Sequence, residues 1–189
     1  MRPSMRVLAR EHLALRALAR IVALEAELLR RDGHVDLALL ENIAAYIAEF
    51  PNRIHHPKEE DYLFLHMRRR DAGRCAPILD RLLDEHVAEV ESIRRFVDAL
   101  AAYRDGKPDA ASQLAEVAGA YARYLDRHIE IEDTQAFPLA EEVLQESDWA
   151  EIDAAFLAND DPLVSGDQRS RFAGLHRRIM AAGAMPPGM

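Results

Sequence analysis

Apolar residues recur at steps of three and four along most of the chain, which is the spacing of one face of an α-helix. The pattern predicts four long helices, at about residues 6–30, 35–70, 76–103 and 109–145. Turns rich in glycine, aspartate and proline separate them, at residues 32–34, 71–74 and 105–108. Because short turns make successive helices antiparallel, we predict an all-α protein, arranged as an up-down-up-down four-helix bundle.

Prolines interrupt two of these helices. Pro51 and Pro57 lie inside the second, and Pro138 lies near the end of the fourth. A proline lacks the backbone N–H of a regular helix and bends the axis, so we expect kinks near these positions. We expect the bundle to occupy residues 1–146 and a C-terminal helical extension, residues 147–189, to pack on it.

The extension carries its own boundary signals. Ser147 is the expected N-cap of a short helix that ends at Ala158. We then predict a turn at 159–162, a last helix at 167–182 and a tail without fixed structure at 185–189.

The composition narrows the classes of function. The chain has 189 residues, a formal net charge of −9 and a pI near 5.4, which argue against nucleic acid as a partner because phosphate binding needs a basic face. The single cysteine, Cys75, excludes a disulfide within the chain and a thiolate metal cluster, and it fits a reducing compartment. The N-terminal residues contain no apolar signal core and no membrane span. We therefore expect a soluble, cytoplasmic protein that does not bind membranes.

Two segments share a His-x-x-x-Glu motif. The first reads His-His-Pro-Lys-Glu-Glu-Asp-Tyr-Leu-Phe from His55, and the second reads His-Ile-Glu-Ile-Glu-Asp-Thr-Gln-Ala-Phe from His128. Their common register pairs His55 with Glu59 and His128 with Glu132. Residues four apart stack on one helical face, with Cβ atoms about 5 to 6 Å apart, so each pair could chelate one cation or bridge two. A single pair of this kind is usually an ordinary surface contact, whereas the repeat favours a site.

Two further histidines, His12 and His86, lie within the apolar stripes of the first and third helices. Counted from the turns, they stand at nearly the same height as the histidines of the two motifs, because each helical residue rises about 1.5 Å. Buried carboxylates and imidazoles without partners are costly, and a pair of metal ions would satisfy all of them. The candidate metal ligands are therefore His12, His55, Glu59, His86, His128 and Glu132.

The remaining histidines are predicted to lie outside this layer. His56 and Glu60 are expected to point about 100° away from the ligand pair, as outer or solvated side chains. His34, His66 and His176 are expected at the surface.

These residues resemble the hemerythrin-like, cation-binding HHE family, and in particular its bacterial members. The likeness covers about residues 6–145 and rests on His12, the segment 55–64, Glu85-His86, and the second motif ahead of Phe137-Pro138. The extension at 148–162 also looks like that of bacterial members. The resemblance implies two non-haem iron ions joined by an oxo or hydroxo bridge. Glu59 and Glu132 would bridge the ions and the four histidines would be terminal ligands.

The sequence departs from the oxygen-carrying members of that family at one place. Those proteins use a fifth histidine one helical turn from the ligand on the third helix, where this chain has Leu82 and Val90. We therefore expect an open coordination position on iron, unless Glu89, Tyr121 or another oxygen donor fills it. The Glu-x-x-His motif of ferritin-like centres and the His-Glu-x-x-His motif of zinc proteases do not occur in the chain.

Three classes of function remain open. The first, which we favour, is a protein that binds or senses O2, NO or peroxide at a di-iron site, with azide as a further small ligand. The second is an enzyme that reduces peroxide or NO, or that donates iron for the repair of iron–sulfur clusters. The third is an interaction module with a structural metal, whose C-terminal helices engage a protein partner or a second copy of the chain.

Overall fold

The computed structural model describes residues 1–157, 163 and 172–181, which form helices and contain no strand. The prediction of an all-α protein is confirmed for this part of the chain. The long helices are α1 (Pro3–Asp32), α2 (Leu37–Glu49), α5 (Ala72–Arg104) and α6 (Ala110–Ile131). The shorter elements are the π-helical segments η1 (Pro51–His55), η2 (Glu59–Phe64) and η3 (Glu132–Ala136), and the helices α3 (His56–Lys58), α4 (Leu65–Arg70), α7 (Phe137–Val143), α8 (Glu146–Phe156) and α10 (Ala173–Ala181).

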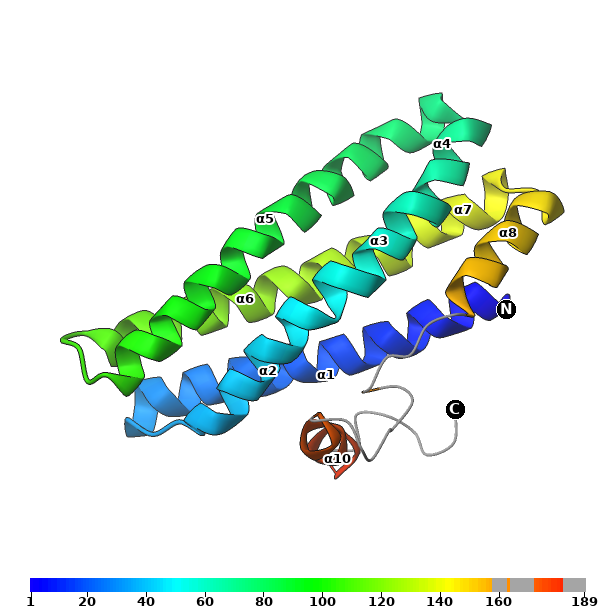
Figure 1. Ribbon diagram of the computed structural model, residues 1–189. Coiled ribbons are helices and arrows are strands. Elements are labelled where there is room, and N and C mark those ends of the chain that lie inside the picture. The colour runs from blue at the N-terminus through cyan, green and yellow to red at the C-terminus, as the bar shows by residue number, and fades with distance from the viewer. Residues whose placement is uncertain (158–162, 164–171, 182–189) are drawn as a thin grey trace.

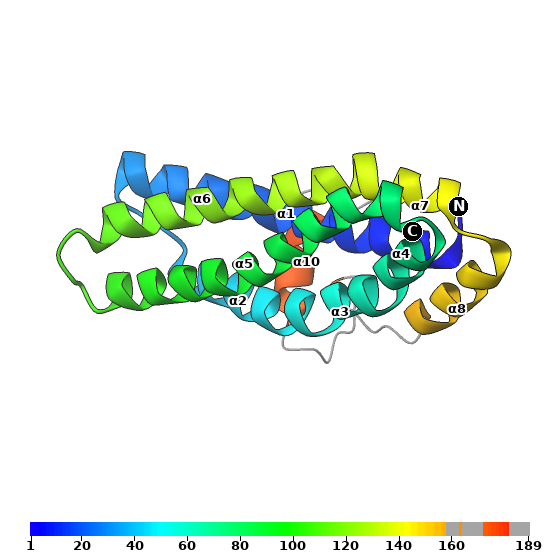
Figure 2. The same cartoon turned by 90° about the horizontal axis from the view of Figure 1, so that it is seen from above.

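The long helices α1, α2, α5 and α6 lie side by side along one long axis (Figure 1). α1 packs along α6, α6 also packs against α5, and α2 packs against α5. The chain continues from α2 through η1, α3 and η2 into α4, and from α6 through η3 into α7. Seen from above, it runs back and forth between the two ends of the molecule (Figure 2). Gly33 and Gly106 take left-handed conformations, with φ of 69° and 66°, in the two turns at one end.

Several helix boundaries differ from those predicted. The turn expected at 71–74 is shorter, because Gly73 already lies in α5. The Asp71 side chain accepts a hydrogen bond from the backbone N–H of Arg74 at 3.0 Å and so caps α5. The predicted N-cap Ser147 is wrong, since α8 is capped by Gln145, whose backbone N–H donates to Asp148 at 2.8 Å.

The expected kinks are π-helical turns. The backbone N–H of His56 donates to the carbonyl of Pro51, and that of Phe137 donates to the carbonyl of Glu132, five residues back in each case. The next residue in each segment is a proline, which has no N–H to continue the regular ladder. Such turns insert an extra residue into a helix and are frequent at functional sites. They set the directions of the side chains around both His-x-x-x-Glu motifs.

The buried apolar residues form two clusters. The turn-side core lies next to the glycine turns and includes Leu18, Ile43, Phe96 and Leu114. The Trp-side core lies at the other end and includes Leu63, Phe64, Leu79 and Trp149. Each run of helices passes from one core to the other through a short buried polar stretch, which in α1 is Glu11 and His12. The polar layer between the two cores contains the candidate site.

The described parts of the C-terminal extension pack on the other helices. α8 contacts α1 and η2, and the Ser4 backbone N–H donates to Asp153 at 2.9 Å. α10 contacts α1 and α2, where Arg178 pairs with Asp36 at 2.7 Å. The turn predicted at 159–162, the first residues of the predicted last helix and the predicted tail at 185–189 lie outside the described residues.

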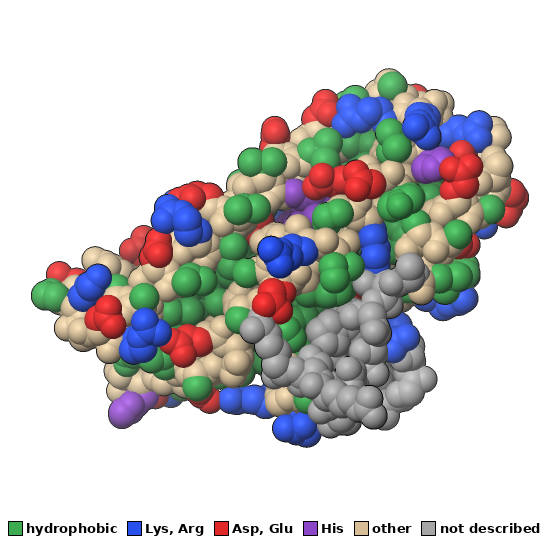
Figure 3. Space-filling view, in the orientation of Figure 1, with side chains coloured by type: hydrophobic (Ala, Val, Ile, Leu, Met, Phe, Trp, Pro, Cys, Tyr) green, Lys and Arg blue, Asp and Glu red, His purple; other side chains and the backbone are tan. Residues whose placement is uncertain are grey.

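The surface carries both signs of charge. Acidic and basic side chains are interspersed over the face shown in Figure 3, and a small histidine surface lies beside acidic side chains midway along it. None of the helices in the described ranges is long and apolar enough to cross a membrane.

Candidate metal centre

The structure brings all six candidate ligands into one layer. Each is at most 4% exposed. They come from six elements: His12 from α1, His55 from η1, Glu59 from η2, His86 from α5, His128 from α6 and Glu132 from η3. The equal heights counted from the turns therefore correspond to real proximity in space.

The two carboxylates lie between the histidines. Glu132 Oε2 is 3.4 Å from His12 Nε2, and its Oε1 is 3.4 Å from His128 Nε2 and 3.7 Å from His86 Nε2. Glu59 Oε1 is 4.0 Å from His12 Nε2, while its Oε2 is 3.5 Å from His55 Nε2 and 3.8 Å from His86 Nε2. Donor atoms each about 2.1 Å from one ion lie roughly 3 to 4.2 Å apart, so these separations suit shared cations.

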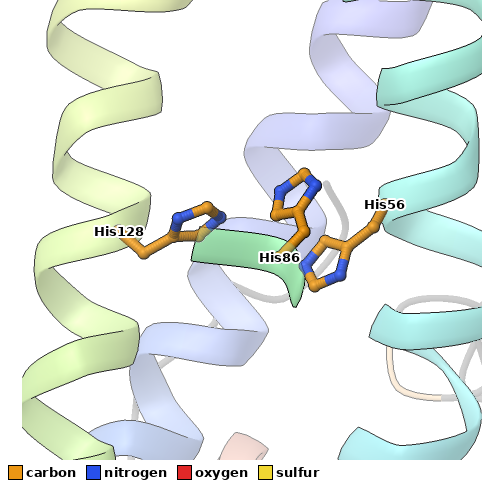
Figure 4. A group of neighbouring side chains, drawn as sticks. All are labelled: His56, His86 and His128. Atoms are coloured by element: carbon orange, nitrogen blue, oxygen red, sulfur yellow. The ribbon is translucent and has the colours of Figure 1, made fainter. Parts of the chain in front are cut away.

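The potential donor atoms fall into two adjacent groups. One comprises His12, His55, Glu59 and Glu132, with one donor atom from each lying within 4.8 Å of the others. The second comprises His56, His86 and His128 by the same measure, and Figure 4 shows these three rings converging from α3, α5 and α6. Glu132 contacts members of both groups, which is what a carboxylate that bridges two ions must do.

Unpaired polar atoms test whether these residues fit a metal. Seven buried atoms of the candidate ligands have no hydrogen-bond partner among the described residues: His12 Nε2, His86 Nε2, His128 Nε2 and both carboxylate oxygens of Glu59 and of Glu132. Leaving one such group unpaired costs about 1 to 3 kcal/mol, and more for a charged group. Nitrogen and oxygen atoms that converge on each other without sharing protons are the donor set of a cation site, so the residues fit a metal pair.

In each of the four candidate histidines, the ring nitrogen that points away from the layer is hydrogen-bonded to a carboxylate. The Nδ1–H groups donate from His12 to Asp133 at 2.8 Å, from His55 to Glu11 at 2.7 Å, from His86 to Glu60 at 2.7 Å and from His128 to Glu85 at 2.9 Å. A carboxylate only accepts hydrogen bonds, so Nδ1 carries a proton in each ring, and Nε2, facing the layer, is the atom whose lone pair a metal takes when it displaces any second proton.

The electrostatics of the layer attract positive charge. Burial opposes a charge on His128, yet the neighbouring carboxylate of Glu132 and the hydrogen bond to Glu85 raise its pKa to about 10. Burial, together with the charge of Glu132, holds the pKa of Glu59 well above its usual range. Burial acts in the same direction on Glu132, but His128 outweighs it and holds the Glu132 pKa well below its usual range. A metal cation can replace the proton that this arrangement retains.

A fifth imidazole lies in the layer, so the prediction that His56 points away from it is wrong. His56 is 4% exposed, and its ring stacks on that of His86 with centroids 3.9 Å apart and planes inclined by 12°. Stacked rings direct their lone pairs along parallel planes, so the two rings do not aim at one ion in this arrangement. The π-turn that closes at His56 turns it inward, which a regular step of about 100° per residue does not predict.

Of the oxygen donors considered from the sequence, Glu89 lies in the layer and Tyr121 supports it. The Tyr121 hydroxyl donates to Glu89 Oε1 at 2.7 Å, and Glu89 Oε2 lies 3.3 Å from His56 Nε2. Burial raises the pKa of Glu89. Val90 is 57% exposed, so a histidine there would face solvent instead of the layer.

His66 was predicted at the surface, and this is wrong. It is 6% exposed, with Nδ1 3.3 Å from Asp148 and Nε2 3.4 Å from Glu151. These contacts tie α4 to α8, away from the polar layer. Glu60 lies outside the layer as predicted and holds His86.

Comparison with known families supports a cation site. Residues 4–143 match the hemerythrin HHE cation-binding domain. The chain belongs to this family. The matched region contains all six candidate ligands and His56, and the family resemblance inferred from the motifs is confirmed. Searches of curated proteins and of solved structures gave no match. A metal-binding role follows from the family and from the clustered histidines and carboxylates together.

Proposed function

We propose that the chain binds two non-haem iron ions in the polar layer and uses this centre to bind or sense a small ligand: O2, NO or peroxide. The observation that carries the proposal is the set of seven inward-facing nitrogen and oxygen atoms without hydrogen-bond partners among the described residues. Membership of a cation-binding family supports the same reading.

The distances support a role for each candidate ligand. His12 and His55 would hold one ion, and His86 and His128 the other. Glu59 and Glu132 would span both. His56 and Glu89 lie beside the second group and remain available as further donors or as packing partners. Bound iron would supply redox chemistry and coordination positions for a small ligand, while the protein holds the rings and excludes bulk water.

A cavity gives small molecules a way to approach. It has a volume of about 450 Å³ and is lined in part by His12, with mostly apolar walls that include Met5, Leu13 and Phe137. Phe137 also stacks on His12, with ring centroids 5.3 Å apart. Apolar walls suit uncharged ligands such as O2 and NO, which need no charged group to bind them.

The helix arrangement is consistent with this function. The contacts of α1 with α6, of α6 with α5 and of α5 with α2 support an up-down-up-down bundle, with the site in its interior. Cys75 is buried, and burial raises the pKa of its thiol, which agrees with an unmodified cysteine in a reducing compartment such as the cytoplasm.

Metal analysis of purified protein tests the proposal. We expect about two iron atoms per chain in the native protein and a large loss on His55→Ala. His66→Ala is the matched control, because His66 is also buried and paired with an acid but lies outside the layer. Equal iron contents in the two variants, or no iron in the native protein, would contradict the proposal.

The absorption spectrum then distinguishes binding from catalysis. On exposure to O2, NO or peroxide, a binding or sensing protein changes its spectrum once, in proportion to the iron present. An enzyme instead consumes peroxide or NO over many turnovers in the presence of a reductant. We expect the stoichiometric change, with sustained turnover as the result that would favour the enzyme.

A further inference from the structure

All four candidate histidines share one feature: a carboxylate accepts the hydrogen bond from Nδ1, the ring nitrogen that faces away from the candidate metal site. In every case the acid belongs to a different element from the ring that it holds: Glu11 of α1 for His55, Asp133 of η3 for His12, Glu60 of η2 for His86, and Glu85 of α5 for His128. A backbone carbonyl could orient an imidazole equally well. The chain instead places a carboxylate side chain at all four positions.

Such a charge acts through the ring. A carboxylate that accepts the Nδ1–H bond pulls the proton towards itself and makes Nε2 a stronger electron donor. A stronger donor stabilises a trivalent ion more than a divalent one, since the interaction grows with the charge of the cation. The four acids therefore bear on the oxidation state of the centre as well as on the orientation of its ligands.

We infer that Glu11, Glu60, Glu85 and Asp133 are positioning residues that set the reduction potential of the centre and poise it towards the ferric state. The inference rests on the proposed iron site and goes beyond it, because it concerns which oxidation state the protein favours. A protein poised in this way takes up its ligand in the oxidised form or gives up electrons readily to an oxidant.

The four acids differ in burial, which ranks their effects. The side chain of Glu11 is 1% exposed, that of Glu85 17%, and those of Asp133 and Glu60 35% and 37%. Solvent screens exposed charges, so the buried Glu11 has the largest influence. Arg16 donates to Asp133 and Arg81 to Glu85, and these positive charges reduce the effect of both acids further.

Glutamine variants separate charge from orientation. A glutamine keeps an oxygen that can accept the Nδ1–H bond but removes the negative charge. Glu91→Gln is the matched control, because Glu91 is on the same helix as Glu85 but pairs with Arg94 at the surface. Iron content is measured first on every variant, so that a failure of the proposed iron site is recognised before any potential is compared.

Potentiometric titration of the iron-loaded protein gives the main test. With each ferrous ion losing one electron to a mediator of known potential, Glu11→Gln should raise the midpoint. We expect a shift of about tenfold in the oxidised-to-reduced equilibrium, or roughly 59 mV for a one-electron couple. Glu60→Gln should shift it less and Glu91→Gln not at all. Unchanged midpoints in Glu11→Gln and Glu85→Gln with full iron content would overturn the inference.

Redox-silent ions give a second measurement that does not need iron to remain bound. Gallium(III) and zinc(II) can compete for the metal-free protein, and their relative affinity reports the preference for trivalent over divalent charge. We expect Glu11→Gln to lower the gallium-to-zinc preference about tenfold relative to the native protein. The same preference in Glu11→Gln and Glu91→Gln would show that the acids only orient the rings.

Discussion

The turn-side core and the polar layer use the same helices in opposite ways. In the turn-side core, regular helices bury residues such as Leu18, Ile43 and Phe96 at helical spacing. In the polar layer, two of the helical runs change to π-turns, and carboxylates that are 0% exposed replace aliphatic side chains. The core is stable through apolar burial alone. In the layer, by contrast, carboxylate and imidazole atoms lack hydrogen-bond partners among the described residues, and the free energy that this costs is offset by apolar burial in the two cores.

Removing the Glu132 carboxylate, which lies between the histidines, should have the largest effect on this contrast. Glu132 contacts three of the candidate histidines, so Glu132→Ala should abolish stoichiometric iron binding. Bound metal stabilises by about 2.7 kcal/mol at a hundredfold excess over its Kd, which corresponds to a rise in Tm of roughly 5 to 10 °C for a chain of this size. Chelation should therefore lower the Tm of the native protein and leave that of Glu132→Ala unchanged. Equal melting of native protein with and without metal would mean that the layer is ordinary polar core.

A pair of phenylalanine truncations sharpens the comparison. Phe96 is fully buried in the turn-side core, whereas Phe64 lies in the Trp-side core with its ring 6.0 Å from that of His86. Each change to alanine should cost about 3 to 5 kcal/mol in the free energy of unfolding, measured with denaturant. Only Phe64→Ala should also alter the absorption spectrum of the iron-loaded protein. A spectral change in Phe96→Ala of the same size would show that the two regions are coupled.

The pH dependence of stability should have opposite signs in the metal-free and metal-loaded proteins. The pKa of His128 is raised from 6.5 to about 10 in the absence of metal, so its contribution to stability is full below pH 6.5 and is lost as the pH rises towards 10. In the loaded protein the metal needs unprotonated ligands, so stability falls as the pH is lowered. Thermal melts between pH 6 and 10 measure both trends, and parallel curves would contradict this account.

The smallest effect is expected outside the layer, at the attachment of α8. Asp148 accepts hydrogen bonds from Arg70 and from the backbone of Gln145, and the Arg70 bond lowers its pKa to about 2. Its contribution is present above pH 3.8 and is lost as the pH falls to about 2. Asp148→Asn should cost about 1 to 2 kcal/mol and leave the iron content unchanged. A loss of iron in this variant would place α8 within the functional unit.

The regular parts of the fold were predictable because their physics is local. Helical spacing gave the long helices, and equal distances from the turns gave the common height of His12, His55, His86 and His128. The register shared by the two motifs separated Glu59 from Glu60, whose different surroundings the structure bears out.

The positions of His56 and His66 were not predicted correctly, because they depend on a break in the helical hydrogen-bond pattern and on a residue far along the chain. His56 turns inward because a π-turn closes just before Pro57, and an angular step based on a regular helix misplaces it. His66 is buried by α8, whose Asp148 lies 82 residues later in the chain. No local sequence pattern predicts that α8 packs there. The signal that could have indicated these two π-turns is a proline directly after the residue that closes the turn, Pro57 after His56 and Pro138 after Phe137.

The origin of the ligands in six separate elements also fixes when the centre can form. The first candidate ligand is His12 and the last is Glu132, so no shorter stretch of the chain contains the complete set. During synthesis, the N-terminal histidine must wait until α6 and η3 have emerged and packed beside α1. On the proposed function, the complete donor set is therefore available only after the helices from α1 to η3 have come together. The melting temperature of protein from iron-starved cells should then report how much metal the chain has acquired.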